Sequence, residues 1–193
     1  ASVSMKYEYR GWDKGYPFAY DCVIIYTLSS NNHLEIITEI INKDSGLIPV
    51  QDGWHPYFCF GAGIDELQLE FQTKEKLEFN DALIPTGELE KYEEFGSLKK
   101  IGNTVFDNCY RVNFHECQPL CVLRDISKKL QLEIYPGEAY PYLNIYTPEH
   151  RKSIAIENLS AAPDAFNNGM GLITLARGKS ALFKTAYRIT ALN

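Results

Sequence analysis

Leu67-Gln68-Leu69-Glu70-Phe71 decides the fold class, because apolar and polar side chains alternate strictly along this stretch. Successive side chains of a β-strand point to opposite faces, so a period of two predicts a strand with one buried face. The same alternation returns in Leu130-Gln131-Leu132-Glu133-Ile134 and in Phe183-Lys184-Thr185-Ala186-Tyr187-Arg188-Ile189. The repeated pattern predicts a sheet whose inner face packs against a core.

Two further stretches, 18–28 and 34–41, are rich in β-branched and aromatic residues and are predicted to be strands. Asn31-Asn32 between them predicts the turn of a hairpin. No window of a dozen residues shows a 3.6-residue period with caps at both ends. Many short strands broken by Gly, Pro, Asn and Asp predict an all-β fold, an antiparallel β-sandwich. No linker or composition break interrupts it, so residues 1–193 are predicted to form a single domain.

The composition excludes several classes of protein. The 193 residues are 45 % apolar and 23 % charged, which is typical of a soluble globular domain. A net charge of −6 argues against nucleic-acid and anionic-membrane partners, since both require a positive surface. No apolar run approaches the roughly 20 residues that cross a bilayer, and the start shows no signal peptide. An odd, irregularly spaced set of cysteines favours reduced thiols, so we expect a cytoplasmic protein; these are Cys22, Cys59, Cys109, Cys117 and Cys121.

The segment Gly53-Trp54-His55-Pro56-Tyr57-Phe58 holds the first candidate for chemistry. The imidazole of His55 can exchange a proton near neutral pH, and the rings of Trp54 and Tyr57 suit the apolar faces of a sugar. Taken alone, a histidine flanked by Trp and Pro is more often a packed, hydrogen-bonded loop residue than a catalyst.

Two carboxylates join His55 as acid–base candidates. Asp107 is flanked by aromatic and β-branched residues, and Glu157 ends the stretch Ser153-Ile154-Ala155-Ile156-Glu157. In a regular strand, Glu157 points to the face opposite Ile154 and Ile156. A long segment follows Glu157, and such loops often carry function. Either carboxylate alone is also compatible with an ordinary surface position.

Taken together, these residues resemble the aldose 1-epimerases (galactose mutarotases). The resemblance rests on four stretches in the family's order and approximate spacing: His55 in G-W-H-P-Y-F, Asp107 in F-D-N-C-Y, I-Y-T-P at 145–148, and I-E-N-L-S-A-A-P-D-A-F-N-N at 156–168. The first and the last are fairly specific in combination. The resemblance covers essentially the whole chain and implies a large β-sandwich of the supersandwich type.

The resemblance also implies an activity, the interconversion of the α and β anomers of a free aldose by opening and reclosing its ring. By their positions in the motifs, Glu157 would be the base and protonated His55 the acid, while Asp107 would hold sugar hydroxyls. Proton transfer is the whole reaction, so neither a metal nor an organic cofactor is expected. The expected partner is a monosaccharide.

The chain departs from the family pattern at its N-terminus. Family members usually carry more sequence upstream, including an H-G segment whose histidine assists at the sugar and an arginine that binds it. We therefore expect this chain to lack roughly the N-terminal third of the pattern and the sandwich to be short of several strands. Uncovered edge strands favour pairing with another chain, so a homodimer is an expected state.

Two other functions stay open. A sugar-binding or assembly module could keep the fold and cleft without turnover. A sugar-phosphate epimerase would need cations near the cleft, for which Arg111 and Arg151 are candidates.

Two further patterns give only weak indications of a metal site and of a nucleotide site. His115, Cys117, Cys121 and Cys109 lie near one another in sequence but lack the paired spacing of a structural zinc site. The G-x-G within residues 60–64 lacks a third glycine and a surrounding βαβ unit, which argues against a dinucleotide site.

Overall fold

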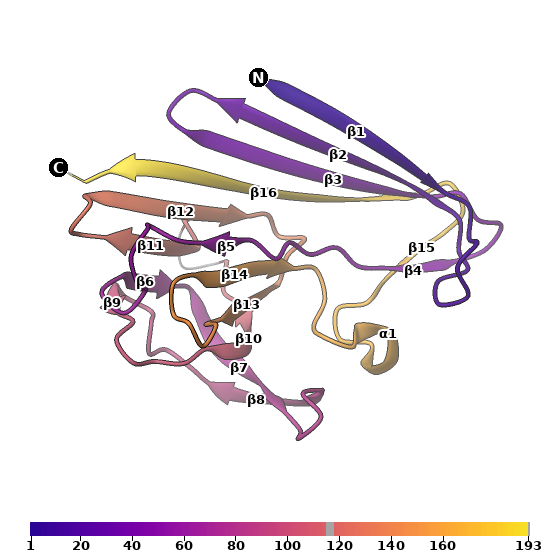
Figure 1. Ribbon diagram of the computed structural model, residues 1–193. Coiled ribbons are helices and arrows are strands. Elements are labelled where there is room, and N and C mark those ends of the chain that lie inside the picture. Colours follow the sequence, from indigo (N-terminus) through magenta and orange to yellow (C-terminus); the bar gives the residue numbers. More distant parts are fainter. Residues whose placement is uncertain (115–117, 193) are drawn as a thin grey trace.

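The computed structural model describes residues 1–114 and 118–192, which form two large sheets and a small one (Figure 1). The eight-stranded sheet contains, from edge to edge, β1 (Ser2–Tyr9), β2 (Tyr20–Ser29), β3 (His33–Asn42), β16 (Ser180–Ala191), β12 (Leu130–Pro136), β11 (Cys121–Asp125), β6 (Gln68–Phe71) and β9 (Lys99–Lys100).

The six-stranded sheet contains, in order, β5 (Tyr57–Phe58), β14 (Ile154–Leu159), β13 (Tyr142–Tyr146), β10 (Asp107–Val112), β7 (Thr73–Phe79) and β8 (Pro85–Lys91). The small sheet pairs β4 (Ile48–Val50) with β15 (Ile173–Leu175), and the helix α1 (Ala165–Asn168) is a single turn. All strand pairs are antiparallel, as the sequence predicts.

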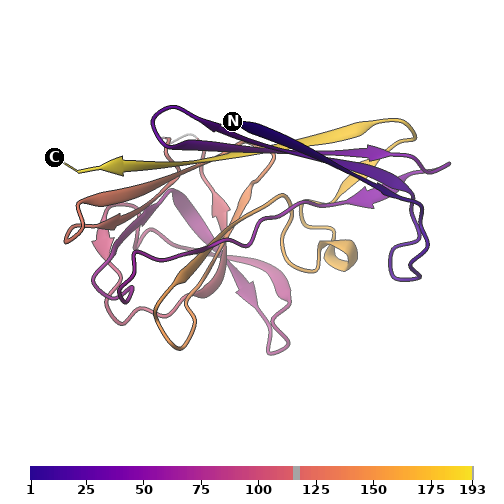
Figure 2. The same ribbon diagram turned by 45° about the horizontal axis from the view of Figure 1, so that its top comes forward.

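The two large sheets form the layers of a sandwich. In Figure 1 the strands β1, β2, β3, β16 and β12 of the eight-stranded sheet form the upper layer, and Figure 2 shows β1, β2, β3 and β16 extending as one layer above β4 and α1. The main core lies between the layers, where Leu69 and Phe71 of β6 and Ile134 of β12 meet Ile145 of β13 and Ile156 of β14. The alternation in 67–71 and 130–134 thus marks strands that bury one face, which confirms the prediction.

The predicted hairpin at Asn31-Asn32 is also confirmed. β2 and β3 pair from Tyr20–Asn42 to Ser29–His33, and both asparagines adopt positive φ angles of 63° and 54°. Asparagine tolerates this left-handed conformation, and two such residues in a row match the right-handed twist of the flanking strands.

Some strands are not among those that the sequence pattern identifies. β4 is only three residues long and pairs only with β15, more than 120 residues later. The charged residues Lys74-Glu75-Lys76 lie on β7, which pairs with β10 and β8, and Glu88–Lys91 lie on β8, the edge strand of the six-stranded sheet. β8 is exposed on both faces after Pro85, and such an edge strand needs no apolar alternation, so the pattern that identifies central strands does not find it.

Candidate active site

Glu157 lies on the outer face of the six-stranded sheet, the face turned away from the eight-stranded sheet. Its neighbours Ile154 and Ile156 are buried between the layers, so the side chain of Glu157 points the other way, as predicted. Strand pairing places Asn144 of β13 opposite Glu157 and Cys109 of β10 opposite Asn144. The strands β14, β13 and β10 therefore present a row of three side chains, with Glu157 at its end.

Asp107 belongs to the adjacent row on the same face. It pairs with Tyr146, which pairs with Ala155, which in turn pairs with Tyr57 of β5. Because side chains two residues apart share a face, Asp107 and Tyr57 lie on the side that carries Glu157. The fold thus brings Asp107, Tyr57 and Glu157, which lie far apart in sequence, to one surface.

His55 reaches this surface because the segment before β5 runs along β14. Gly53 forms a bridge with Leu159, and the Trp54 N–H donates to the carbonyl of Asn158 at 3.1 Å. The register that continues into the Tyr57–Ala155 pair sets His55 opposite Glu157, and His55 Nε2 lies 3.1 Å from Glu157 Oε1. Glycine allows this close approach, since a Cβ at position 53 would lie 2.8 Å from Leu159 Cδ2.

The carboxylate of Glu157 is buried, with 6 % of its side chain exposed. Burial raises its pKa above the ordinary value and the charge of Asp107 raises it further, while His55 and a hydrogen bond with Asn144 lower it. Oε1 is 3.1 Å from His55 Nε2, yet it makes no aligned hydrogen bond with any described residue. Oε1 therefore keeps a lone pair free to accept a proton from a ligand.

His55 is open to a ligand. Its side chain is 55 % exposed, and its ring stacks on Tyr57 with centroids 5.0 Å apart and planes inclined by 24°. The stacking holds the imidazole over the outer face while one side remains accessible. A carboxylate base and an exposed imidazole in contact can perform paired proton transfer.

The fold does not place the side chain of Trp54 beside His55, Tyr57 and Glu157. Its ring packs between the sheets against both main core clusters and meets Tyr26 edge-on, with centroids 5.9 Å apart. In an extended segment, neighbouring side chains point to opposite faces, so Trp54 and His55 face opposite ways. We therefore leave Trp54 out of the proposed site, whereas Tyr57 stays in it.

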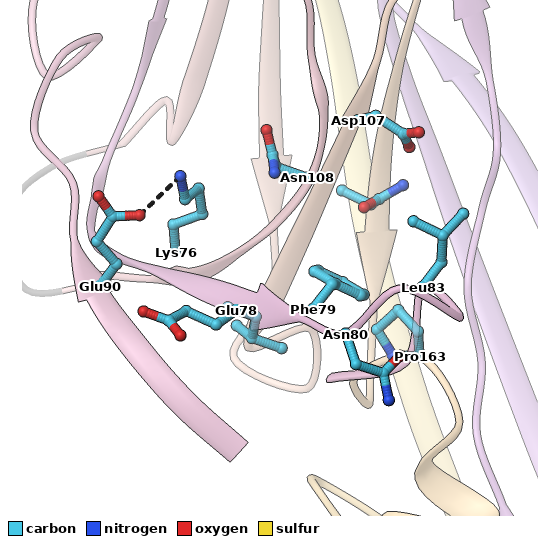
Figure 3. A pocket seen from close by; sticks show the side chains of 11 residues that line it. Lys76, Glu78, Phe79, Asn80, Leu83, Glu90, Asp107, Asn108 and Pro163 are labelled. Carbon is cyan, nitrogen blue, oxygen red and sulfur yellow. Dashed lines mark ion pairs between the residues drawn. The ribbon is translucent and has the colours of Figure 1, made fainter. Parts of the chain in front are cut away.

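A cavity of about 530 Å³ adjoins the site on the side of Asp107. It is lined by polar side chains of the sheet, among them Asp107, Asn108 and Asn144. Figure 3 shows Asp107 on one side of the cavity and the ion pair of Lys76 with Glu90 on the other, where Nζ and Oε2 are 2.8 Å apart. Its volume falls within the range of small-molecule sites.

Asn144 is the site residue that the sequence analysis missed. It stands alone as a polar residue between Leu143 and Ile145, which are both buried in the core. Its polar character in an otherwise apolar and aromatic strand was the available signal.

Hydrogen bonds hold the segment that carries His55 and the strand that carries Glu157. Asp52 and Ser160 exchange bonds, since the Ser160 N–H donates to the Asp52 carbonyl at 2.9 Å and the Ser160 hydroxyl accepts from the Asp52 N–H at 2.8 Å. The Asp52 carboxylate in turn accepts from the hydroxyl of Tyr140 at 2.5 Å. Across the core, Asn158 Nδ2 donates to Thr185 Oγ1 at 2.8 Å, which ties β14 to the opposite sheet.

The predicted phosphate ligands lie elsewhere. Arg151 pairs with Asp65 at 2.6 Å and donates to the carbonyls of residues 102 and 104, while Arg111 pairs with Glu75 at 3.4 Å. Neither arginine lines the cavity next to Asp107. Both are engaged in contacts of their own, which does not support the prediction of a phosphate site.

The described cysteines of the cysteine-rich stretch do not lie together in the structure. Cys109 lies on β10 and Cys121 on β11, in different sheets, and burial raises the pKa of the Cys109 thiol to about 12. His115 and Cys117 lie outside the described residues. Among residues 1–114 and 118–192, no group of three His, Cys, Asp or Glu side chains could hold a metal ion, and no helix is long and apolar enough to cross a membrane.

Comparison with known proteins agrees with this fold. The chain superposes over its whole length on a galactose mutarotase-like protein from Clostridium acetobutylicum (TM-score 0.88, 17 % identity, 63 % of that chain). It also superposes over its whole length on galactose 1-epimerase from Lactobacillus acidophilus (TM-score 0.85, 19 % identity, 64 % of that chain). The uncharacterized protein YihR of Escherichia coli is 28 % identical over 180 residues, which are 86 % of this chain and 54 % of YihR.

The chain therefore spans somewhat more than half of that relative and less than two thirds of these two structures. The profile of one protein family, Aldose 1-epimerase, matches residues 1–188. This match covers nearly the whole chain, and with it we conclude that the chain belongs to the aldose 1-epimerase family.

Proposed function

We propose that the protein interconverts the α and β anomers of a free aldose, with Glu157 as base and His55 as acid. The observation that carries the proposal is the 3.1 Å contact between His55 Nε2 and the otherwise unbonded Oε1 of buried Glu157, on a face that also presents Asp107 and Asn144. In a cyclic aldose, the anomeric hydroxyl oxygen and the ring oxygen are both bonded to C1. A neighbouring base and acid are thus suited to reach both oxygens at once.

In the proposed reaction, the Glu157 carboxylate takes the proton of the anomeric hydroxyl. The O–H electron pair forms the C1=O double bond, and the bond between C1 and the ring oxygen breaks. The ring oxygen keeps that electron pair and takes a proton from the His55 imidazolium. Rotation about the C1–C2 bond exposes the other face of the aldehyde, and the reverse steps close the ring with the roles exchanged. These transfers require no cofactor.

The electrostatics of the site suit this role. Burial raises the pKa of Glu157, which makes the carboxylate a stronger base than an exposed glutamate. Asp107 and Asn144 offer acceptors and a donor for sugar hydroxyls, and the ring of Tyr57 offers an apolar face. Paired general acid–base catalysis of this kind contributes roughly 10²–10⁴-fold in rate.

The test follows the optical rotation of freshly dissolved α-galactose or α-glucose. The wild type should accelerate the approach to equilibrium, and Glu157→Gln and His55→Asn should each lose about 10²-fold or more of that acceleration. His33→Asn and Glu66→Gln, which change a half-buried and an exposed side chain outside the site, serve as controls. A wild-type rate equal to the spontaneous rate would refute the proposal.

A binding module is the second candidate, because the half-exposed His55 leaves the described site open on one side. Calorimetric titration with the same sugars separates the two. Binding that is lost in Asp107→Ala, without any acceleration of mutarotation, would favour the module over the enzyme.

A further inference from the structure

The hydroxyl of Ser160 takes the place of a backbone carbonyl in the pairing between β14 and the segment that carries His55. The Ser160 N–H donates to the Asp52 carbonyl at 2.9 Å, as in a regular antiparallel pair. The second bond of a regular pair would run from the Asp52 N–H to the Ser160 carbonyl, but this N–H donates to Ser160 Oγ at 2.8 Å. Since β14 ends at Leu159 and the chain bends at Ser160, the side chain extends the ladder by one residue.

His55 itself lies between two pairs that contribute one backbone hydrogen bond each. On one side of it, the Trp54 N–H donates to the carbonyl of Asn158 at 3.1 Å. On the other side, Pro56 has no N–H to donate, and its carbonyl accepts from the Ile156 N–H at 3.3 Å. Within the part of the chain that the structure describes, neither pair exchanges two bonds. The position of the backbone at His55 therefore depends on the doubly bonded pair that precedes it.

The pair of Asp52 with Ser160 also sets which residues lie opposite each other. Asp52 precedes His55 by three residues and Ser160 follows Glu157 by three, so the same antiparallel register places His55 opposite Glu157. Asp52 is a fixed point, because its carboxylate also accepts from the buried hydroxyl of Tyr140 at 2.5 Å. Ser160 is itself buried, so water cannot readily replace its hydroxyl.

The contact that depends on this register is short. His55 Nε2 lies 3.1 Å from Glu157 Oε1, and the imidazole is half-exposed, so the surrounding side chains do not enclose it. A displacement of about 1 Å in a catalytic group can cost roughly 10²-fold in rate. A hydroxyl that fixes the backbone at residue 52 can therefore affect catalysis without touching the substrate.

We propose that Ser160 is a positioning residue of the active site: its buried hydroxyl, by accepting from the Asp52 N–H, fixes the segment 52–55 on β14 and holds His55 against Glu157. The effect of Ser160 on catalysis rests on the proposed function. Its effect on the contact between His55 and Glu157 does not, and the two are measured separately.

Thr147 makes the same kind of contact elsewhere in the sheet and supplies a matched control. It directly follows β13, its N–H donates to the Phe106 carbonyl, and the Phe106 N–H donates to Thr147 Oγ1, both at 2.9 Å. This pair lies next to Asp107 instead of His55. Ser160→Ala and Thr147→Val each leave one backbone N–H without its acceptor, so a loss of stability is expected in both. Only Ser160→Ala should displace His55.

Carbon-13 NMR of the glutamate carboxyl groups tests the geometry without any substrate, with the Glu157 signal identified by its loss in Glu157→Gln. Burial raises the pKa of Glu157 and the charge of Asp107 raises it further, while His55 lowers it. A displaced His55 should therefore raise the pKa of Glu157 in Ser160→Ala, whereas Thr147→Val should not raise it. An unchanged pKa in Ser160→Ala, or an equal rise in both variants, would overturn the proposal.

Mutarotation kinetics test the effect on catalysis. In Ser160→Ala, kcat should fall by roughly 10-fold to 10²-fold with little change in KM, because the acid is misplaced while Asp107 still binds the sugar. Thr147→Val should instead raise KM more than it lowers kcat. A wild-type kcat in Ser160→Ala would refute the positioning role and leave the proposed reaction intact. A wild type without mutarotation would refute the proposed function, and the NMR measurement would still decide whether Ser160 holds His55.

Discussion

Replacing Tyr140 by Phe removes one oxygen atom and leaves the carboxylate of Asp52 without its 2.5 Å donor. Tyr140 is fully buried, so water cannot readily replace the hydroxyl. A hydrogen bond to a charged group contributes about 1.5–3 kcal/mol, against about 0.5–1.5 kcal/mol for a neutral pair. We expect the free energy of unfolding at neutral pH to fall by about 1.5–3 kcal/mol, or Tm by about 3–12 °C for a domain of this size.

The loss should depend on pH with a definite sign. Burial raises the pKa of Asp52, and the hydrogen bond from Tyr140 partly offsets this, so the variant raises that pKa further. A raised pKa in the folded state costs stability as pH rises through it. The defect should therefore be smallest at the acidic end of the range, where the carboxyl takes up its proton, and should grow toward pH 7.

Urea unfolding of both proteins from pH 4 to pH 8 measures this directly. Tyr135→Phe is the matched control, because Tyr135 donates to Glu133 at 2.6 Å far from the site, and Arg188 and Gln131 also bond that carboxylate. Its loss should be smaller, and mutarotation should be unchanged. A Tyr140→Phe defect that is independent of pH, or larger in acid, would refute the reasoning.

Three further predictions concern the strands and loop around the site. Asn158→Ala removes the buried hydrogen bond to Thr185 and should lower the free energy of unfolding, measured in urea, by about 1–3 kcal/mol. A loss below about 0.5 kcal/mol would contradict a stabilising role for this hydrogen bond. Glu157→Gln should raise the free energy of unfolding, because the raised pKa of Glu157 costs the wild type stability as the carboxylate ionises. The increase measured by urea unfolding should grow from pH 4 to pH 8, and an increase that shrinks with pH would contradict the sign. Gly171→Ala should lower Tm more than Gly169→Ala, since both have positive φ (79° and 75°) but only at Gly171 would a Cβ meet the backbone of residues 160–161, at 3.1–3.2 Å; equal losses would contradict it.

The sequence predicts the central strands well and the edges poorly. The alternation in 67–71, 130–134 and 183–189 identifies β6, β12 and β16 because each buries one face against the core. β1 is not among the predicted strands, although its residues also alternate between polar and apolar; all but its last residue are exposed. β4 contains three residues and forms only through its distant partner β15.

Some features of the site also follow from local sequence patterns, whereas others depend on long-range strand pairing. Local alternation is enough to predict that Glu157 points away from the core. The contact between His55 and Glu157 depends on the pairing of residues 53–58 with β14, about 100 residues later, which no local pattern contains. Alternation also explains the position of Trp54. Because it is the immediate neighbour of His55 in an extended segment, its side chain faces the core instead of the site.

The most direct test of the central claim is the exchange rate between the anomers at equilibrium. Saturation-transfer NMR of the anomeric protons of galactose or glucose, at one enzyme concentration, measures that rate for the wild type, Glu157→Gln and the His33→Asn control. The proposed roles predict faster exchange with the wild type and the control than in buffer, and a loss of about 10²-fold or more of that acceleration in Glu157→Gln. Exchange that is no faster with the wild type than in buffer, or that Glu157→Gln leaves unchanged, would contradict the assignment of Glu157 as the base.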